Sequence, residues 1–193
     1  MTFNQIKNVA LNHFRDKGYE GTSMAHIADD VGIKKQSIYT HFKGKDELFL
    51  QVCSDVFEAE LEFVLNYIDS NKTKPIEEFL FNFLLLYKDR YEKNNATKFW
   101  LRISFFPPTH LYEQVIKYLY EYLDKVEIHL LLVIESAMVE GEISSTIDAK
   151  RATSAFLGVL DGVLVEMLYG GSERLMKRLD ASWYLFWRGL TKE

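Results

Sequence analysis

Residues 21–48 constrain the fold most strongly, because they carry two short helical signals on either side of one glycine. Thr22 and Ser23 are residue types that accept hydrogen bonds from the free N–H groups at a helix start. The apolar residues that follow are spaced as one helical face: Met24, Ile27, Ala28 and Val31. Gly32 then provides the backbone freedom for a sharp turn. The stretch predicts two short helices, the second over residues 34–42, joined by a tight turn.

The second short helix has a polar outer face. Its apolar residues Ile38 and Phe42 should point inward. The outer positions are rich in hydrogen-bond donors: Lys34, Lys35, Gln36, Ser37, Tyr39, Thr40 and His41. A surface of this length and chemistry fits the major groove of DNA. The sequence therefore indicates a DNA-binding protein.

Several motifs near the start of the chain belong together. They read IxxVA at residues 6–10, IAxxVGI at 27–33, SIYTHF at 37–42 and KDEL at 45–48. In these motifs the chain resembles the TetR-like (tetracycline-repressor-like) transcriptional regulators, over about the first quarter of its length. The resemblance implies an all-helical, homodimeric, ligand-responsive regulator, most often a repressor. One departure is Lys34, where many members of the family place a Ser or Thr that caps the second short helix.

Each candidate DNA contact has a chemical role. Gln36 is predicted to read a base, because its amide can donate to and accept from adenine. Ser37 and Thr40 are predicted to touch a base or its phosphate. Five side chains are predicted to contact the DNA backbone and so fix the register: Tyr39, His41, Lys34, Lys43 and Lys45. The full predicted set is Thr22, Ser23, Lys34, Lys35, Gln36, Ser37, Tyr39, Thr40, His41, Lys43 and Lys45.

The charge distribution agrees with DNA binding, although the net charge is −5. Residues 1–50 hold seven basic and six acidic side chains, a balance of +1, so the remainder carries −6. Residues 32–45 contain four lysines and no acid. The positive charge is thus concentrated on one edge that can approach phosphates.

The rest of the chain predicts an all-α protein of about nine helices, since it shows no strand signal of useful length. We expect residues 1–48 to form a helix-turn-helix DNA-binding domain of three helices. Residues 49–193 are expected to form a helical bundle for ligand binding and dimerisation. The resulting homodimer would read a palindromic operator whose half-sites lie about one helical turn, or a multiple of it, apart.

Aromatic residues make up 15% of the chain. Core packing is one explanation. The other is a pocket for a small hydrophobic or cationic effector, with a carboxylate selecting a cation. The family resemblance supports such a pocket, and the candidate lining residues are Phe63, Tyr67, Phe83, Tyr87, Trp100, Phe105 and Asp161. Asp161 could instead serve a subunit interface or a local hydrogen bond.

The last two predicted helices carry the dimerisation signal. Small residues on one helix would allow a second helix to approach closely, and the terminal helix has more apolar surface than it needs alone. Two copies related by a two-fold axis would bury this surface in a four-helix bundle. The predicted interface comprises Ala155, Gly158, Gly162, Leu175, Leu179, Trp183, Phe186 and Trp187.

Other classes of function find little support. Cys53 is the single cysteine, the five histidines lack metal-ligand spacing, and no phosphate loop or nucleophile motif is present, so we expect no enzyme, metal or cofactor. We find no signal peptide and no membrane span, which makes the cytoplasm the expected location. Two alternatives stay open: a ligand-independent architectural DNA-binding module, and a helical enzyme or carrier with a vestigial head.

Overall fold

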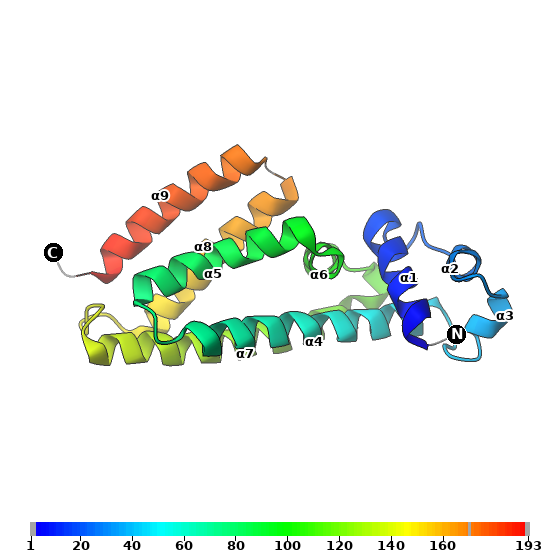
Figure 1. Ribbon diagram of the computed structural model, residues 1–193, viewed down its shortest axis with the longest axis horizontal. Coiled ribbons are helices and arrows are strands. Elements are labelled where there is room, and N and C mark those ends of the chain that lie inside the picture. The colour runs from blue at the N-terminus through cyan, green and yellow to red at the C-terminus, as the bar shows by residue number, and fades with distance from the viewer. Residues whose placement is uncertain (1–2, 170, 192–193) are drawn as a thin grey trace. The chain divides into compact units, whose positions relative to one another are not determined.

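The computed structural model describes residues 3–169 and 171–191, and the regular secondary structure of these residues is helical. The helices are α1 (Phe3–Lys17), α2 (Met24–Val31), α3 (Lys35–Ile38), α4 (Lys45–Asn71), α5 (Ile76–Lys93), α6 (Asn95–Phe105), the short 3₁₀ helix η1 (Thr109–Leu111), α7 (Tyr112–Glu140), α8 (Ala149–Tyr169) and α9 (Ser172–Leu190) (Figure 1). This confirms the prediction of an all-α fold with a helix-turn-helix head.

The turn between α2 and α3 forms as the sequence indicates. The Ser23 hydroxyl accepts a hydrogen bond from the backbone N–H of His26 at 3.2 Å and so caps α2. Gly32 ends α2 in the left-handed conformation, with φ 77°, and its N–H donates to Asp29 O at 3.0 Å. The helix α2 therefore has defined ends on both sides.

The helix α3 is shorter than predicted, with four residues instead of the expected span 34–42. Lys34 occupies its N-cap position and provides no side-chain cap. After Ile38 the chain continues as a turn, in which the N–H groups of His41 and Phe42 both donate to Ile38 O. The turn keeps Phe42 on the same buried side as Ile38.

The chain divides into two compact units. The first unit comprises residues 3–60 with Asn94–Tyr122, and the second comprises Leu61–Lys93 with residues 123–169 and 171–191. Both α4 and α7 contribute residues to each unit. Because this division follows packing alone, the separation into functional domains at residue 48 stays a prediction.

Aromatic side chains form the core of the first unit. Phe14 on α1, Phe49 on α4 and Phe99 on α6 are all buried. The ring centroids of Phe14 and Phe49 lie 4.9 Å apart in an edge-to-face arrangement, and those of Phe49 and Phe99 lie 5.9 Å apart. Such pairs add to the stabilisation that burial alone provides. They join α1, which supports the helix-turn-helix, to α4 and α6.

The second unit is built around α5 and α8. Phe83 on α5 and Phe156 on α8 are fully buried, with ring centroids 5.8 Å apart. Figure 1 shows α8 and α9 running side by side, and their close packing buries Leu175 and Leu179 of α9. By length and composition, α8 is the one described helix that could cross a membrane. This is weak evidence for a span, because core helices of soluble proteins meet the same criteria.

Candidate nucleic-acid interface

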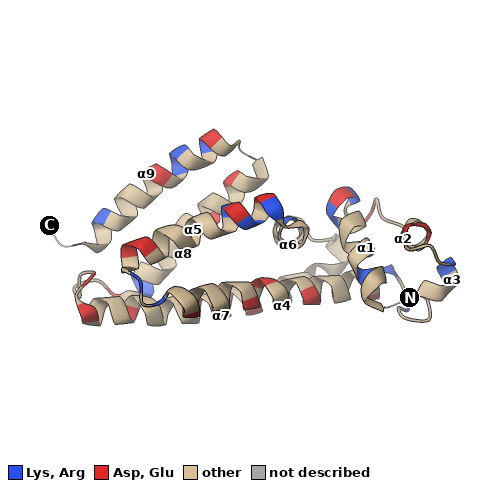
Figure 2. Cartoon of the chain, in the orientation of Figure 1, with Lys and Arg blue, Asp and Glu red and all other residues tan. Residues whose placement is uncertain are grey.

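The helix α3 presents polar side chains outward over an apolar base. Ile38 and Phe42 are buried beneath it. The seven outward positions predicted from the sequence are all exposed: Lys34, Lys35, Gln36, Ser37, Tyr39, Thr40 and His41. Figure 2 shows basic colouring at α3, while acidic residues lie on α2. The exposed surface therefore has the composition expected of a groove-reading element.

Contacts within the head organise part of this surface. The Thr40 hydroxyl donates to Ser37 O at 2.7 Å, so Thr40 is held against its own turn. The Lys35 ammonium lies 5.9 Å from the centroid of the Tyr39 ring. Within the described residues, the Gln36 amide forms no hydrogen bond and can pair with a base edge. These positions agree with the predicted roles, which themselves stay predictions.

Thr22, Ser23 and Lys45, which also belong to the predicted DNA-binding set, form hydrogen bonds around the start of α2. Thr22 is buried, and its hydroxyl donates to Gly18 O at 2.7 Å. The Lys45 ammonium donates to Tyr19 O at 2.9 Å and to Thr22 O at 3.1 Å. Ser23 caps α2. In the structure these side chains position the segment that precedes α2, and phosphate contacts by them stay a prediction.

A polar cluster that also involves Lys45 was not predicted from the sequence. The Tyr19 hydroxyl donates to the Asp46 carboxylate, and His110 Nε2 lies 3.5 Å from Asp46 Oδ1. The Tyr19 and His110 rings are 4.9 Å apart, and the Lys45 ammonium is 3.9 Å from the Tyr19 centroid. We call Tyr19, Lys45, Asp46 and His110 the tyrosine cluster. It links the start of α4 to the loop before α2 and to η1.

We expect the Tyr19→Phe substitution to raise the pKa of Asp46. The hydrogen bond from the Tyr19 hydroxyl, followed by that from His110, holds this pKa below its ordinary value of 3.8. A carboxyl whose pKa is lowered by folding stabilises the fold above its unfolded pKa, and this contribution is lost as pH falls through the folded value. An NMR titration of the side-chain carboxyl between pH 2 and 6 measures the change. Asp16, whose pKa is lowered by Arg15, is the internal control. An unchanged Asp46 midpoint would contradict this role of Tyr19.

The candidate ligand-binding residues fall in both units. In the second unit, the rings of Tyr67 and Phe83 lie 5.6 Å apart, and those of Phe83 and Tyr87 lie 5.5 Å apart. The Arg90 guanidinium lies 3.7 Å from the centroid of the Phe63 ring. The structure thus brings Tyr67, Phe83 and Tyr87 together, and packs Phe63 against a cation.

The other three candidates are placed differently. Trp100 is buried in the first unit, and its ring centroid lies 5.3 Å from that of Tyr122. Phe105, also in the first unit, is 40% exposed. Asp161 is exposed on α8, beside the small residues Gly158 and Gly162. This position favours the interface role for Asp161 over the selection of a cation inside an aromatic core.

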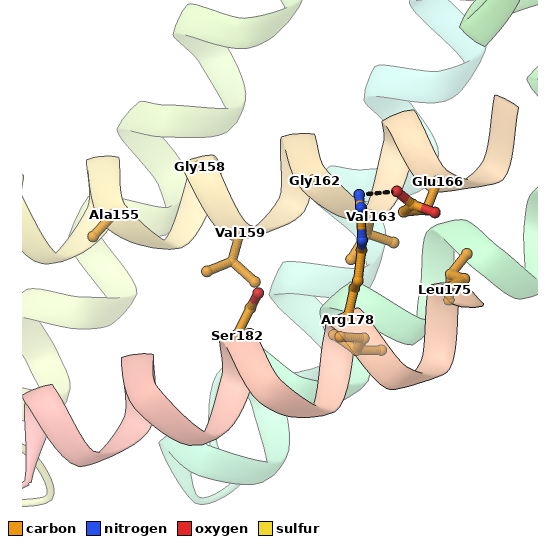
Figure 3. Close-up of a pocket in the computed structure, with 10 residues that line it drawn as sticks. Ala155, Gly158, Val159, Gly162, Val163, Glu166, Leu175, Arg178 and Ser182 are labelled. Carbon is orange, nitrogen blue, oxygen red and sulfur yellow. Dashed lines mark hydrogen bonds and ion pairs between the residues drawn. The ribbon is translucent and has the colours of Figure 1, made fainter. Parts of the chain in front are cut away.

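A groove of about 500 Å³ runs between α8 and α9 (Figure 3). Its lining includes five predicted interface residues: Ala155, Gly158, Gly162, Leu175 and Leu179. At one end, the buried Glu166 of α8 is paired with Arg178 of α9 and lies 2.9 Å from Arg174 Nε. The close-up shows Arg178 extending from α9 to Glu166. These ion pairs fasten α9 to α8 within one protomer.

The predicted apolar surface of α9 is used largely within the protomer. Leu175 and Leu179 are buried. The ring centroids of Trp183 and Phe81 lie 5.3 Å apart, and those of Phe186 and Phe156 lie 5.7 Å apart. Trp187 stacks on Trp183 at 5.6 Å.

The large apolar residues that α9 leaves exposed were not in the predicted interface set. They are Met176, Tyr184 and Leu185. At 3.6 residues per turn, Tyr184 lies about 80° round the helix from Met176, and Leu185 lies about 100° beyond Tyr184. Leu185 is thus on the opposite side of α9 from Met176. Apolar residues on more than one side of a helix can be recognised in its sequence. Because one side is enough to pack on α8, the additional apolar residues indicate a second contact surface.

An all-helical chain that exposes a donor-rich helix after a glycine turn has the architecture of a helix-turn-helix DNA-binding protein. Residues 6–52 match the family model described as "Bacterial regulatory proteins, tetR family". The chain is therefore TetR-like, and its helix-turn-helix head is the part that carries the match.

Individual relatives agree with this assignment. The biofilm operon icaADBC HTH-type negative transcriptional regulator IcaR of Staphylococcus epidermidis is 33% identical over 90 residues, which cover 46% of this chain and 49% of that protein. The match thus spans about half the length of this curated relative. A TetR-family regulator from Mesorhizobium loti has a TM-score of 0.73 at 22% identity, over 98% of this chain and 96% of that one. FadR from Bacillus subtilis, solved in complex with stearoyl-CoA, has a TM-score of 0.68 at 16% identity, over 96% and 97%. At these identities the two structures show the fold alone.

Proposed function

We propose that this protein is a transcriptional repressor that binds a two-fold operator as a homodimer and is released by a small-molecule effector. The observation that carries the proposal is the exposure of Lys35, Gln36 and their neighbours over the buried Ile38 and Phe42. A polar face on an apolar base is what a recognition helix needs, since it must stay folded while its outer side chains leave water for a groove. Lysines nearby supply the phosphate contacts that position it.

Repression and effector binding are supported by the compared proteins. IcaR is described as a negative transcriptional regulator, and FadR was solved with stearoyl-CoA. In this chain, the aromatic group of Tyr67, Phe83 and Tyr87 on α4 and α5 favours an effector with a hydrophobic or cationic body. We propose that the effector binds beside these three rings in the second unit.

The proposed switch is a shift between two populations of the dimer. In one, the spacing of the two heads fits successive major grooves, and in the other it does not. An effector that binds the second arrangement more tightly lowers operator occupancy. An effector with equal affinity for both would leave the operator bound.

Dimerisation is proposed to use the outer faces of α8 and α9. Ala155, Gly158 and Gly162 are small, and the groove that they help to line can receive larger side chains from a second copy. Met176, Tyr184 and Leu185 supply exposed apolar surface on the adjacent helix. A two-fold arrangement would place the same patch on both copies.

The Gln36→Ala substitution tests the DNA-reading assignment. We expect it to cost about 1–3 kcal/mol at particular base positions, because a bidentate amide–base pair is lost. The matched substitution Lys43→Ala should weaken binding to all sequences alike, since Lys43 is exposed and is expected to contact phosphate. Selection from a random DNA library, followed by affinity measurements at one fixed salt concentration, compares the two variants. An unchanged base preference in Gln36→Ala would remove Gln36 as a base reader.

A further inference from the structure

The first unit contains a cleft that the proposed function does not use. It has a volume of about 300 Å³ and lies between the end of α1 and the end of α6. The buried rings Phe14, Phe49 and Phe99 form its floor. Its outer wall is formed by Phe106, Pro107 and Pro108. A cleft of this size, at the lower end of the range for ligand pockets, suits a molecule with about one ring.

Two cations border this cleft. They are Arg102 on α6 and Lys17 on α1, with Glu20 as the one acidic lining residue. Among the described residues, neither cation forms a side-chain hydrogen bond or an ion pair. A guanidinium that has no carboxylate partner, beside an apolar wall, is the arrangement that binds a carboxylate through two parallel hydrogen bonds.

The backbone at Gly18 makes room for the guanidinium. Gly18 has φ 70°, and a Cβ atom built there would lie 3.2 Å from Arg102 Nη2. That separation is tighter than ordinary contact, so an added Cβ atom would require the guanidinium to shift by a few tenths of an ångström. Glycine at this position both ends α1 and allows Arg102 to lie along the edge of the cleft.

We propose that this cleft binds a small monocarboxylate with an apolar body, such as an arylacetate. The carboxylate pairs with Arg102 and lies within the field of Lys17. The apolar ring packs between the phenylalanine floor and the outer wall. Glu20 disfavours ligands with more than one negative charge, since a second carboxylate would face it. The bound molecule would touch both α1 and α6, at a place separate from the aromatic group of the second unit.

Phenylacetate is the probe for this proposal, with neutral phenylacetamide as its isosteric control. Isothermal titration of the full-length protein at fixed ionic strength should give one weak site per chain for phenylacetate, and binding at least about tenfold weaker for the amide. Arg102→Gln should weaken phenylacetate binding by about tenfold or more, and Arg102→Lys by less. Arg15→Gln is the matched control, because Arg15 is paired with Asp16 outside the cleft.

Three results would overturn the proposal. They are equal affinity for acid and amide, unchanged binding in Arg102→Gln, and equal losses in Arg102→Gln and Arg15→Gln. Circular dichroism melting of each variant verifies that it is folded. Since the measurement requires no DNA, its outcome is independent of whether the protein is a repressor.

Discussion

Replacing Leu185 with glutamate is expected to separate the homodimer into folded monomers. The side chain is 70% exposed on α9, so the change leaves the protomer core intact. In a two-fold dimer it would place a carboxylate in an apolar interface twice, once from each copy. At about 2 kcal/mol for each central interface residue, the two copies together cost about 4 kcal/mol, roughly a thousandfold in the dimer dissociation constant.

Analytical ultracentrifugation over a range of protein concentrations measures this change, and operator affinity should fall with it because two linked heads become two separate ones. Val139→Glu is the matched control: Val139 is 88% exposed on α7, and the substitution has the same chemistry away from α8 and α9. Wild-type protein that sediments as a monomer at micromolar concentration, or a Leu185→Glu protein that remains a dimer, would refute the proposed interface.

The second large effect is expected for Phe14→Ala. Phe14 is 1% exposed and contacts the rings of Phe49, Phe99 and Tyr19. Removing the ring leaves a cavity at the junction of α1, α4 and α6, at a cost of about 3–5 kcal/mol. Because this is a large share of the stability of a small unit, operator binding should be lost at moderate temperature.

Chemical denaturation, monitored by circular dichroism, tests this prediction. Phe105→Ala serves as the control, since Phe105 is 40% exposed and removing its ring should cost only about 1–2 kcal/mol of unfolding free energy. A cost below about 1 kcal/mol for Phe14→Ala would show that the aromatic core contributes little to the head.

The parts of the fold that were predictable are those determined by local sequence. Ser23 and Gly32 set the ends of α2 through contacts with residues within a few positions, so the turn could be inferred directly. The outward face of α3 followed from helical periodicity. The length of α3 did not, because the hydrogen bonds after Ile38 close a turn in place of another helical turn.

The contacts that could not be predicted join residues far apart in the chain. His110 contacts Asp46, which is 64 positions earlier in the chain. A lysine at a helix start is expected to face solvent, but the Lys45 ammonium donates to a backbone carbonyl of the preceding loop. The side of α9 that packs within the protomer could not be predicted either. Its sequence shows two apolar sides but does not indicate which one packs on α8, and the structure assigns Leu175 and Leu179 to that side.

The composition of the first unit has a consequence for synthesis on the ribosome. The recognition elements are complete by residue 48, yet Phe99, Arg102 and His110 come from a segment translated about fifty residues or more later. A nascent chain that has released only its first sixty residues lacks that segment of the core. We therefore expect the helix-turn-helix head to complete its folding only after residue 122 has left the exit tunnel. An isolated fragment of residues 1–60 should be too unstable to occupy an operator.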